Sequence, residues 1–386
     1  MKRIILITTV CACGLLPLQA QSVDEVLQSV AQHNKSIQAQ QKNGEAEKIG
    51  IEAENSLEDP TVEYSSFFSK GVNGQSGSEL VVSQGFDFPT VYNSRNRAGR
   101  DKKEAVDYRA EALRRNVLLE AKTLCLDMIR LNRQRDLLDK RMQNADELLA
   151  LYEERLRAGD ATVIEVNKIK MERMSLQNHT DHRTALQSLL ALNGNMPLTF
   201  EGREYPTVPT TLDFETLCDE VLGQDAELKA AEADTRAAER NLTVNRQKWL
   251  PKLEIGYRRN TGEGSKEHGF LVGGSIPLFS NRRQVRMAQA QSIGTRLQAD
   301  EIRLKAEAAL HSGFNELQQL GRAMSVYDQP LMTQTLELLK ESVKGGELSV
   351  TDYFVEADQI YRNLQAYMEL ECQYQKVAAT LYKNRL

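Results

Sequence analysis

The sequence predicts a mainly helical fold with a small β part, built from very long antiparallel helices that pack as coiled coils. Three observations predict it. Residues 101–158 contain neither Gly nor Pro, and their apolar side chains recur in steps of mostly four and three, the spacing of a coiled-coil seam. A related pattern recurs in the second half of the chain. Four short segments, two in each half, change to the alternation that is typical of β-strands.

Each half ends its longest helix with the same turn. The first long helix is predicted over about residues 93–157, roughly 98 Å at ~1.5 Å per residue. Gly159 follows it as a helix cap, and Thr162 is suited to begin the next helix. In the second half Gly346 and Ser349 occupy the same positions. We therefore interpret the chain as a tandem duplication.

The alignment of the two turns also pairs Glu165 with Asp352. It divides the chain into a first repeat at residues 21–193, a linker rich in Gly and Pro at 194–211, and a second repeat at 212–386. Each repeat is predicted to contain a helix, a β-hairpin, a long helix and a return helix. We expect the hairpins to gather at one end of a helical rod and the turns at the other.

The elements of the first repeat follow from changes in periodicity. A helical pattern ends at Pro60, two alternating segments flank a loop rich in Gly and Ser, and Pro89 leads into the long helix. The predicted elements are a helix at 22–57, strands at 61–68 and 79–88 within a hairpin at 60–88, and a return helix at 162–192.

The second repeat follows the same order with a less regular long helix. Pro330 is expected to bend that helix, which also contains three glycines. The predicted elements are a helix at 213–248, a hairpin at 251–278 with a loop at 261–268, a long helix at 280–344 and a final helix at 348–384. The side to which Arg258 and Arg259 point, near a strand end, is left open.

The first 20 residues have the pattern of a secretory signal peptide. Lys2 and Arg3 precede an apolar run, and Leu18-Gln19-Ala20 is a suitable cleavage site. A less favoured alternative is acylation of a cysteine within this segment. After it, Cys125, Cys218 and Cys372 lie in helical patterns and are expected to be unpaired thiols.

The remainder of the chain lacks an apolar run of the ~20 residues that a membrane helix needs. Four strands of about ten residues have the length of outer-membrane strands but are too few to close a barrel, which needs about eight. If they enter a membrane, several chains must share one barrel, and three chains would contribute twelve strands. The formal charge of −5 gives no indication of nucleic-acid binding.

These features together resemble the TolC family of outer-membrane efflux proteins. The resemblance rests on the tandem order, the strand entry Asp59-Pro60, the strand exits 83–89 and 275–280, and the two Gly-x-x-Ser/Thr turns. It covers essentially the whole chain after the leader. It implies a homotrimer with a twelve-stranded outer-membrane β-barrel and a long periplasmic α-barrel, and no cofactor.

The resemblance also implies partners and a working site. A periplasmic adaptor (membrane fusion) protein would connect the channel to an inner-membrane pump, here of the resistance–nodulation–division type. Gly159, Thr162, Gly346 and Ser349 would form the periplasmic tip that docks the adaptor. Asp352 matches the first of two pore-facing aspartates found in some members.

The second of these aspartates is absent, because Val355 takes its place. Glu356 is adjacent and is expected to contribute to the pore constriction, as is Glu165 in the first repeat. Carboxylates around a narrow aperture favour cations. The alternative for Asp352 is a residue that stabilises the N-terminus of its own helix.

No motif for catalysis or nucleotide binding is present, so we do not expect an enzyme. His179 and His182 could share a helix face, although an exposed helix explains them more simply. The function expected is passive export of metal ions or drugs. The alternative is an exported coiled-coil protein with a structural or binding role.

Overall fold

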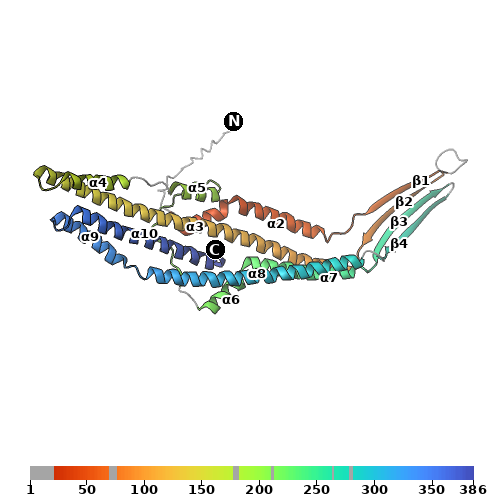
Figure 1. The fold of residues 1–386 in the computed structure, drawn as a ribbon. Helices are drawn as coiled ribbons and strands as arrows, with labels where there is room; N and C mark the ends of the chain where they lie inside the picture. Colours follow the sequence, from red (N-terminus) through yellow and green to blue (C-terminus); the bar gives the residue numbers. More distant parts are fainter. Residues whose placement is uncertain (1–20, 69–75, 177–181, 210–212, 263–264, 278–280) are drawn as a thin grey trace, which may run out of the picture. The chain divides into compact units, whose positions relative to one another are not determined.

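The computed structural model describes residues 21–68, 76–176, 182–209, 213–262, 265–277 and 281–386. The expected leader at 1–20 and His179 lie outside these residues. For His182 the structure describes the backbone but not the side chain. The helices and strands follow each other in the predicted order (Figure 1). The first half contains α1 (Val23–His33), α2 (Lys35–Ala53), β1 (Thr61–Phe67), β2 (Gly77–Phe86), α3 (Pro89–Ala158), α4 (Val163–Ser175) and α5 (His182–Leu192). The second half contains α6 (Phe214–Gln224), α7 (Ala226–Gln247), β3 (Lys252–Gly262), β4 (Ser265–Ser275), α8 (Asn281–Met324), α9 (Gln329–Gly345), α10 (Val350–Leu381) and a short 3₁₀ turn (Lys383–Arg385).

The predicted long helix of the first half is confirmed, and it is longer than expected. Helix α3 has 70 residues and begins at Pro89, a residue that suits the first turn of a helix because its ring fixes φ and its missing N–H needs no partner there. Two arginines, Arg155 and Arg157, lie in its last turn, where positive charge is favoured by the helix dipole.

Four predicted helices are interrupted. The helix expected at 22–57 breaks at Asn34, whose Oδ1 accepts hydrogen bonds from the backbone N–H groups of Ser36 and Ile37. The helix expected at 213–248 breaks at Asp225, which caps α7 in the same manner through the N–H of Leu228. Short polar side chains at these positions satisfy the exposed N–H groups of a new helix, and this outweighs the continuous apolar period.

The other two interruptions lie in the return helix and in the second long helix. The helix expected at 162–192 is divided into α4 and α5. The helix expected at 280–344 ends at Met324 and resumes at Gln329, so the bend predicted near Pro330 is a complete break. Asp328 accepts a hydrogen bond from the N–H of Leu331 and begins the new helix, with Pro330 in its first turn.

The strands form a single antiparallel sheet in the order β1-β2-β3-β4, so a strand from each half pairs at its centre. The predicted bounds of the loop at 261–268 are wrong, because β3 extends to Gly262 and β4 begins at Ser265. Gly and polar residues favoured a loop there, but the ladder of paired residues continues to Gly262 and Ser265.

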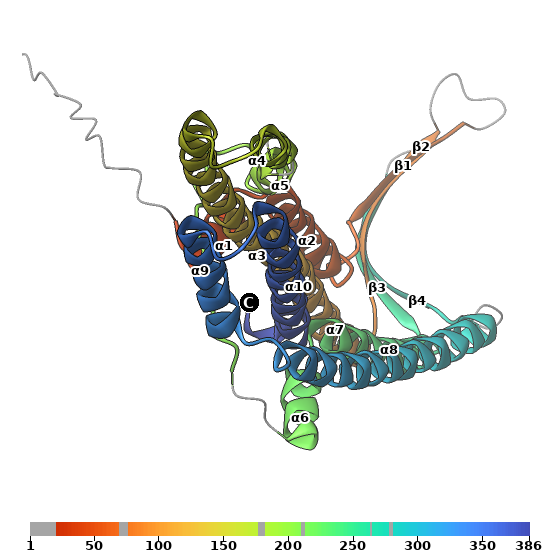
Figure 2. The ribbon, with the colours of Figure 1, turned by 60° about the vertical axis from the view of Figure 1, so that its left-hand side comes forward.

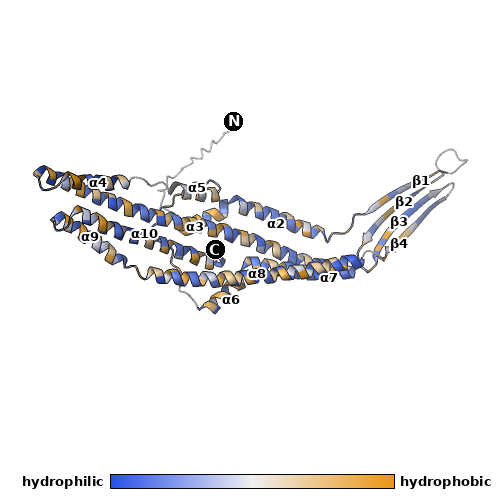
Figure 3. Ribbon diagram, in the orientation of Figure 1, coloured by the Kyte–Doolittle hydropathy of each residue, from blue (hydrophilic) through white to orange (hydrophobic). Residues whose placement is uncertain are grey.

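The register gives the sheet two different faces. The first, which we call the apolar face, carries mainly large apolar and aromatic side chains: Val62, Tyr64, Leu80, Val82, Phe86, Leu253, Ile255, Tyr257, Phe270 and Val272. The opposite, polar face carries mostly charged and small side chains: Glu63, Ser65, Glu79, Ser83, Glu254, Arg258, Asn260 and Glu267. Hydrophilic and hydrophobic residues both occur along the strands (Figure 3). Phe270 and Val272 are 90% and 82% exposed in the single chain, so the apolar face is uncovered.

The chain is divided into two compact units, and each unit takes segments from both halves. The first contains residues up to His33, Glu120–Val208 and Leu320–Lys376. The second contains Asn34–Leu119, Pro209–Gln319 and Val377–Leu386, and so includes the whole sheet. In the second unit the buried residues of α7 are largely alanines, which allow its neighbours to approach closely.

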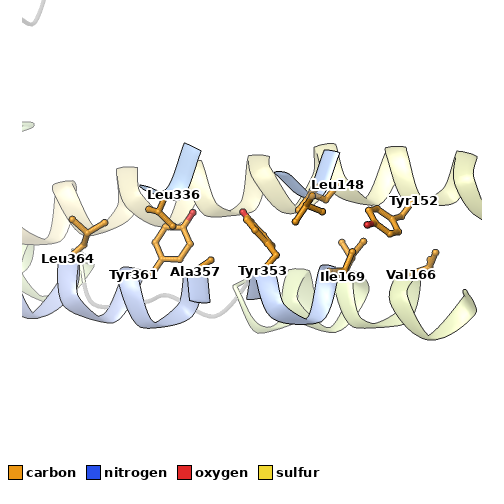
Figure 4. Packing of buried hydrophobic residues seen from close by; sticks show 11 residues of the cluster. Leu148, Tyr152, Val166, Ile169, Leu336, Tyr353, Ala357, Tyr361 and Leu364 are labelled. Carbon is orange, nitrogen blue, oxygen red and sulfur yellow. The ribbon is translucent and has the colours of Figure 1, made fainter. Parts of the chain in front are cut away.

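The first unit contains a hydrophobic cluster between α3, α4, α9 and α10 (Figure 4). Leu148 and Ile169 are completely buried in it, and Tyr353 and Tyr361 add aromatic rings from α10. At ~25 cal/mol per Å² of apolar surface removed from water, each large side chain contributes about 1.5–3 kcal/mol. This cluster fixes the four helix ends that carry the predicted turns.

Candidate functional site at the two helix turns

The first predicted turn joins α3 to α4. Gly159 has a φ of 86°, in the left-handed region that glycine adopts without steric cost. The N–H of Asp160 then donates to the carbonyl of Arg155 at 2.8 Å, which closes the end of α3. Thr162 begins α4 with a capping box: its Oγ1 accepts from the N–H of Glu165, and its own N–H donates to the Glu165 carboxylate at 2.8 Å.

The second turn joins α9 to α10 with the same construction. Gly346 has a φ of 79°, and the N–H groups of Glu347 and Leu348 both donate to the carbonyl of Ser342, at 2.9 and 3.3 Å. Ser349 then begins α10, because its Oγ accepts from the N–H of Asp352 at 3.1 Å. The Gly-x-x-Ser/Thr pattern therefore predicted both turns correctly.

The two turns lie together at one end of the first unit (Figures 1 and 2). Arg155, near the end of α3, connects them. Its guanidinium donates to the carbonyls of Lys344 at 2.6 Å and Val343 at 3.4 Å, at the end of α9. The Val343 carbonyl also accepts from the N–H of Gly346 at 3.1 Å, so the arginine adds to the glycine cap and places positive charge where the helix dipole is negative. Arg155 was not predicted from the sequence, although basic residues in the last helical turn are a recognisable signal.

The acidic residues predicted for a constriction have different environments. The carboxylate of Asp352 accepts a hydrogen bond from the Ser349 hydroxyl at 2.6 Å, so it also stabilises the start of its own helix. Glu165 does the same for α4, and its hydrogen bonds from the backbone and hydroxyl of Thr162, with Arg155 nearby, hold the pKa of Glu165 below its usual value. Glu356 lies one helical turn after Asp352, and both are exposed on α10. Val355 beside them is 64% exposed.

A polar network lies behind the turns. The ammonium of Lys340, which is buried, donates to Asn144 Oδ1 at 2.8 Å and pairs with Glu147 at 2.7 Å. The side chain of Asn144 is held by a second hydrogen bond, because its amide donates to the hydroxyl of Tyr361 at 3.3 Å. The hydrogen bond from Lys340 lowers the pKa of Glu147, so the carboxylate stays charged beside its partner.

A second ionic group joins three helices. The guanidinium of Arg141 on α3 donates to Glu172 on α4 at 2.6 Å and to Asp358 on α10 at 3.1 Å. It also lies 4.8 Å from the centre of the Tyr361 ring, a cation–π contact. These residues fix the helices that carry the turns, and the sequence did not reveal them because charged side chains occur at many surface positions.

Two features of the described residues bear on ligands and membranes. No group of three or more His, Cys, Asp or Glu side chains is arranged to hold a metal ion within the described ranges. None of the helices described is long and apolar enough to span a membrane. Of the five cysteines in the sequence, Cys125, Cys218 and Cys372 lie among the described residues, where they are free thiols.

Comparisons with known proteins give a family and a fold. Residues 217–384 match the model of the outer membrane efflux protein family. The outer membrane channel CmeC of Campylobacter jejuni has a similar structure, with a TM-score of 0.71 and 16% identity, over 94% of this chain and 85% of that one. The fold is therefore that of a known channel protein.

Two curated relatives match shorter stretches. The nickel-cobalt-cadmium resistance protein NccC of Alcaligenes xylosoxydans xylosoxydans is 34% identical over 95 residues, which are 23% of this chain and 21% of that protein. The nickel and cobalt resistance protein CnrC of Cupriavidus metallidurans is 31% identical over 101 residues, 25% of this chain and 24% of that protein. The matched stretches thus cover less than a quarter of the relatives' own length.

Proposed function

Because this chain belongs to the outer membrane efflux protein family, which it matches over residues 217–384, we propose that it is the outer-membrane conduit of a tripartite efflux system. It is a passive channel that carries substrates from an inner-membrane pump and a periplasmic adaptor to the outside. The observation that carries this proposal is the four-stranded sheet, with its exposed apolar face and two open edges at β1 and β4.

The dimensions of the sheet support a position in the outer membrane. Strand β3 has 11 residues, which at ~3.3 Å each extend about 36 Å and, at a tilt of about 40°, cover about 28 Å. An apolar band of outer-membrane strands is about 25 Å high. The apolar face then contacts lipid, and the polar face lines the water-filled interior.

The open edges support a trimer. Edge strands in lipid leave N–H and C=O groups without partners, at a cost of several kcal/mol each. Strand β1 of one copy and β4 of the next are free to pair antiparallel, and three copies would close a twelve-stranded sheet. The helices would then form a shared periplasmic tube.

The turns at Gly159 and Gly346 are the proposed docking site for the adaptor. Apolar side chains next to them are uncovered in the single chain: Val163 and Ile164 are 59% and 72% exposed. Asp352 and Glu356 are the proposed constriction. In a trimer they would give three copies of each carboxylate around one aperture, which favours cations.

The names of the two relatives, which are metal-resistance proteins, support a metal cation as the cargo. The proposed partner is a pump of the resistance–nodulation–division type. Cargo is tested by deleting the gene and measuring growth in nickel and cobalt salts. Sensitivity that the wild-type gene restores and the Asp352→Asn variant does not would support metal export through the constriction. Unchanged tolerance to both metals would refute the metal cargo.

The channel itself is tested by its mass and its conductance. Light scattering of the detergent-extracted protein, with the detergent subtracted, should give three times the mass of the chain, and planar bilayers should then show conducting steps. A monomer without conductance would overturn the channel and favour the alternative, an exported coiled-coil protein with a structural or binding role. In bilayers, Asp352→Asn should reduce the preference for cations while the mass stays that of a trimer.

A further inference from the structure

Three basic side chains interrupt the apolar face near the strand ends farthest from the helices. Arg259 on β3 lies directly opposite His268 on β4, and Lys266 lies two residues before His268, so all three share the apolar face. We call these three residues the basic cluster. All three are exposed.

Direct contacts support this division of the two faces. Tyr257 Oη lies 2.6 Å from His268 Nδ1, which places both side chains on the apolar face. Arg258, the neighbour of Arg259, forms an ion pair with Glu79 at 2.9 Å on the polar face. The two adjacent arginines therefore point to opposite sides of the sheet, a question that the sequence left open.

Within the part of the chain that the structure describes, no acidic side chain neutralises Arg259 or Lys266 of the basic cluster. None of the paired strand positions on the apolar face is Asp or Glu. The side chain of Glu267, between Lys266 and His268, belongs to the polar face because it lies opposite Asn260.

The position of the basic cluster relative to the apolar residues is that of a membrane boundary. The next row toward the helices contains Tyr257 and Phe270, followed by Ile255 and Val272. Tyrosines are enriched where an apolar band meets the aqueous interface, and here Tyr257 lies at this border. The cluster would therefore lie at the height of lipid headgroups, on the side facing lipid.

We propose that the basic cluster binds the phosphate groups of an anionic lipid of the outer leaflet. This inference rests on the proposed function, which places the sheet in the outer membrane. A guanidinium and an ammonium on neighbouring strands can contact phosphate oxygens from two sides, and the ring of His268, held by Tyr257, adds a third donor. The apolar residues below the cluster contact the acyl chains of the same lipid.

The test measures binding of diphosphorylated lipid A to the detergent-solubilised full-length protein by native mass spectrometry, with dephosphorylated lipid A as the reference. The double variant Arg259→Gln/Lys266→Gln should bind the phosphorylated lipid roughly 25-fold more weakly, since each basic residue near a charged surface contributes about five-fold. Arg258→Gln is the matched control, and its affinity should equal that of the wild type.

Three results would overturn the proposal: equal binding of the two lipids, an unchanged affinity in the double variant, or an equal loss in Arg258→Gln. If the double variant does not fold, the comparison of the two lipids on the wild-type protein still tests the proposal. Raising the salt from about 0.05 M to about 0.5 M should weaken binding of the phosphorylated lipid and leave the reference lipid unaffected. A protein that conducts in bilayers but lacks the lipid preference would refute this inference alone, whereas a protein that does not insert would refute the proposed function.

Discussion

Gly345 and Gly346 are adjacent, yet alanine should have opposite effects at the two positions. Gly346 has a φ of 79°, where a Cβ costs about 1–2 kcal/mol, and the space around it is open, so the penalty comes from the backbone alone. Gly345 is the last residue of α9, and its Cβ would meet only ordinary contacts with Glu347 at 3.8 Å. Gly345→Ala should therefore stabilise the turn by about 0.4–1 kcal/mol.

The assay is hydrogen exchange at the amide of Glu347, which donates to Ser342 across the turn. Gly346→Ala should speed its exchange by about 5–30-fold, and Gly345→Ala should slow it by about 2–5-fold. Both variants should keep the mass of the wild-type protein in detergent, because neither residue belongs to the sheet that is proposed to join the copies. Exchange that changes in the same direction in both variants would refute the argument from the left-handed backbone.

Three further predictions concern the helices around the turns. Leu148→Ala should lower the free energy of unfolding by about 2–5 kcal/mol, whereas the exposed Leu338→Ala should change it by less than about 0.5 kcal/mol, as measured by urea unfolding with circular dichroism. Arg155→Gln should cost about 1–3 kcal/mol in the same measurement, because the end of α9 loses its charged donor; a variant as stable as the wild type would contradict this. The lowered pKa of Glu165 means that its stabilising effect is present above the ordinary glutamate pKa of about 4.3 and is lost as the pH falls through the lower folded value. Thr162→Ala should raise that pKa toward the ordinary value in an NMR titration, and an unchanged pKa would show that Thr162 is not the cause.

The sequence predicted the order of the elements because periodicity and turn chemistry are local. The change from helical to alternating spacing located the strands, and Gly159 and Gly346 located both turns. Asn34 and Asp225 were missed as helix breaks because their neighbours continue the apolar period. The hydrogen bonds of a capping side chain favour a new helix, whereas the apolar spacing favours a continuous one. The spacing alone does not show which of the two effects is larger.

The candidate site could be predicted only in part. The glycines and their capping residues follow from the local sequence, but the contact of Arg155 with the end of α9 joins residues nearly 190 positions apart. The same limit applies to Lys340 and Asn144. The boundary of the two repeats and the roles of Asp352 and Glu356 at a constriction remain predictions.

The pairing of β2 with β3 has a consequence for how the protein folds. Val82 pairs with Tyr257, about 175 residues later in the chain, so the centre of the sheet is a contact of very high sequence separation. Helix α3 needs only its own residues and its near neighbours, and it can form early. In the first hairpin, by contrast, the edge of β2 stays unpaired until β3 has been synthesised. We therefore expect the sheet to be the last part of the chain to acquire its structure, and to need protection from aggregation until then.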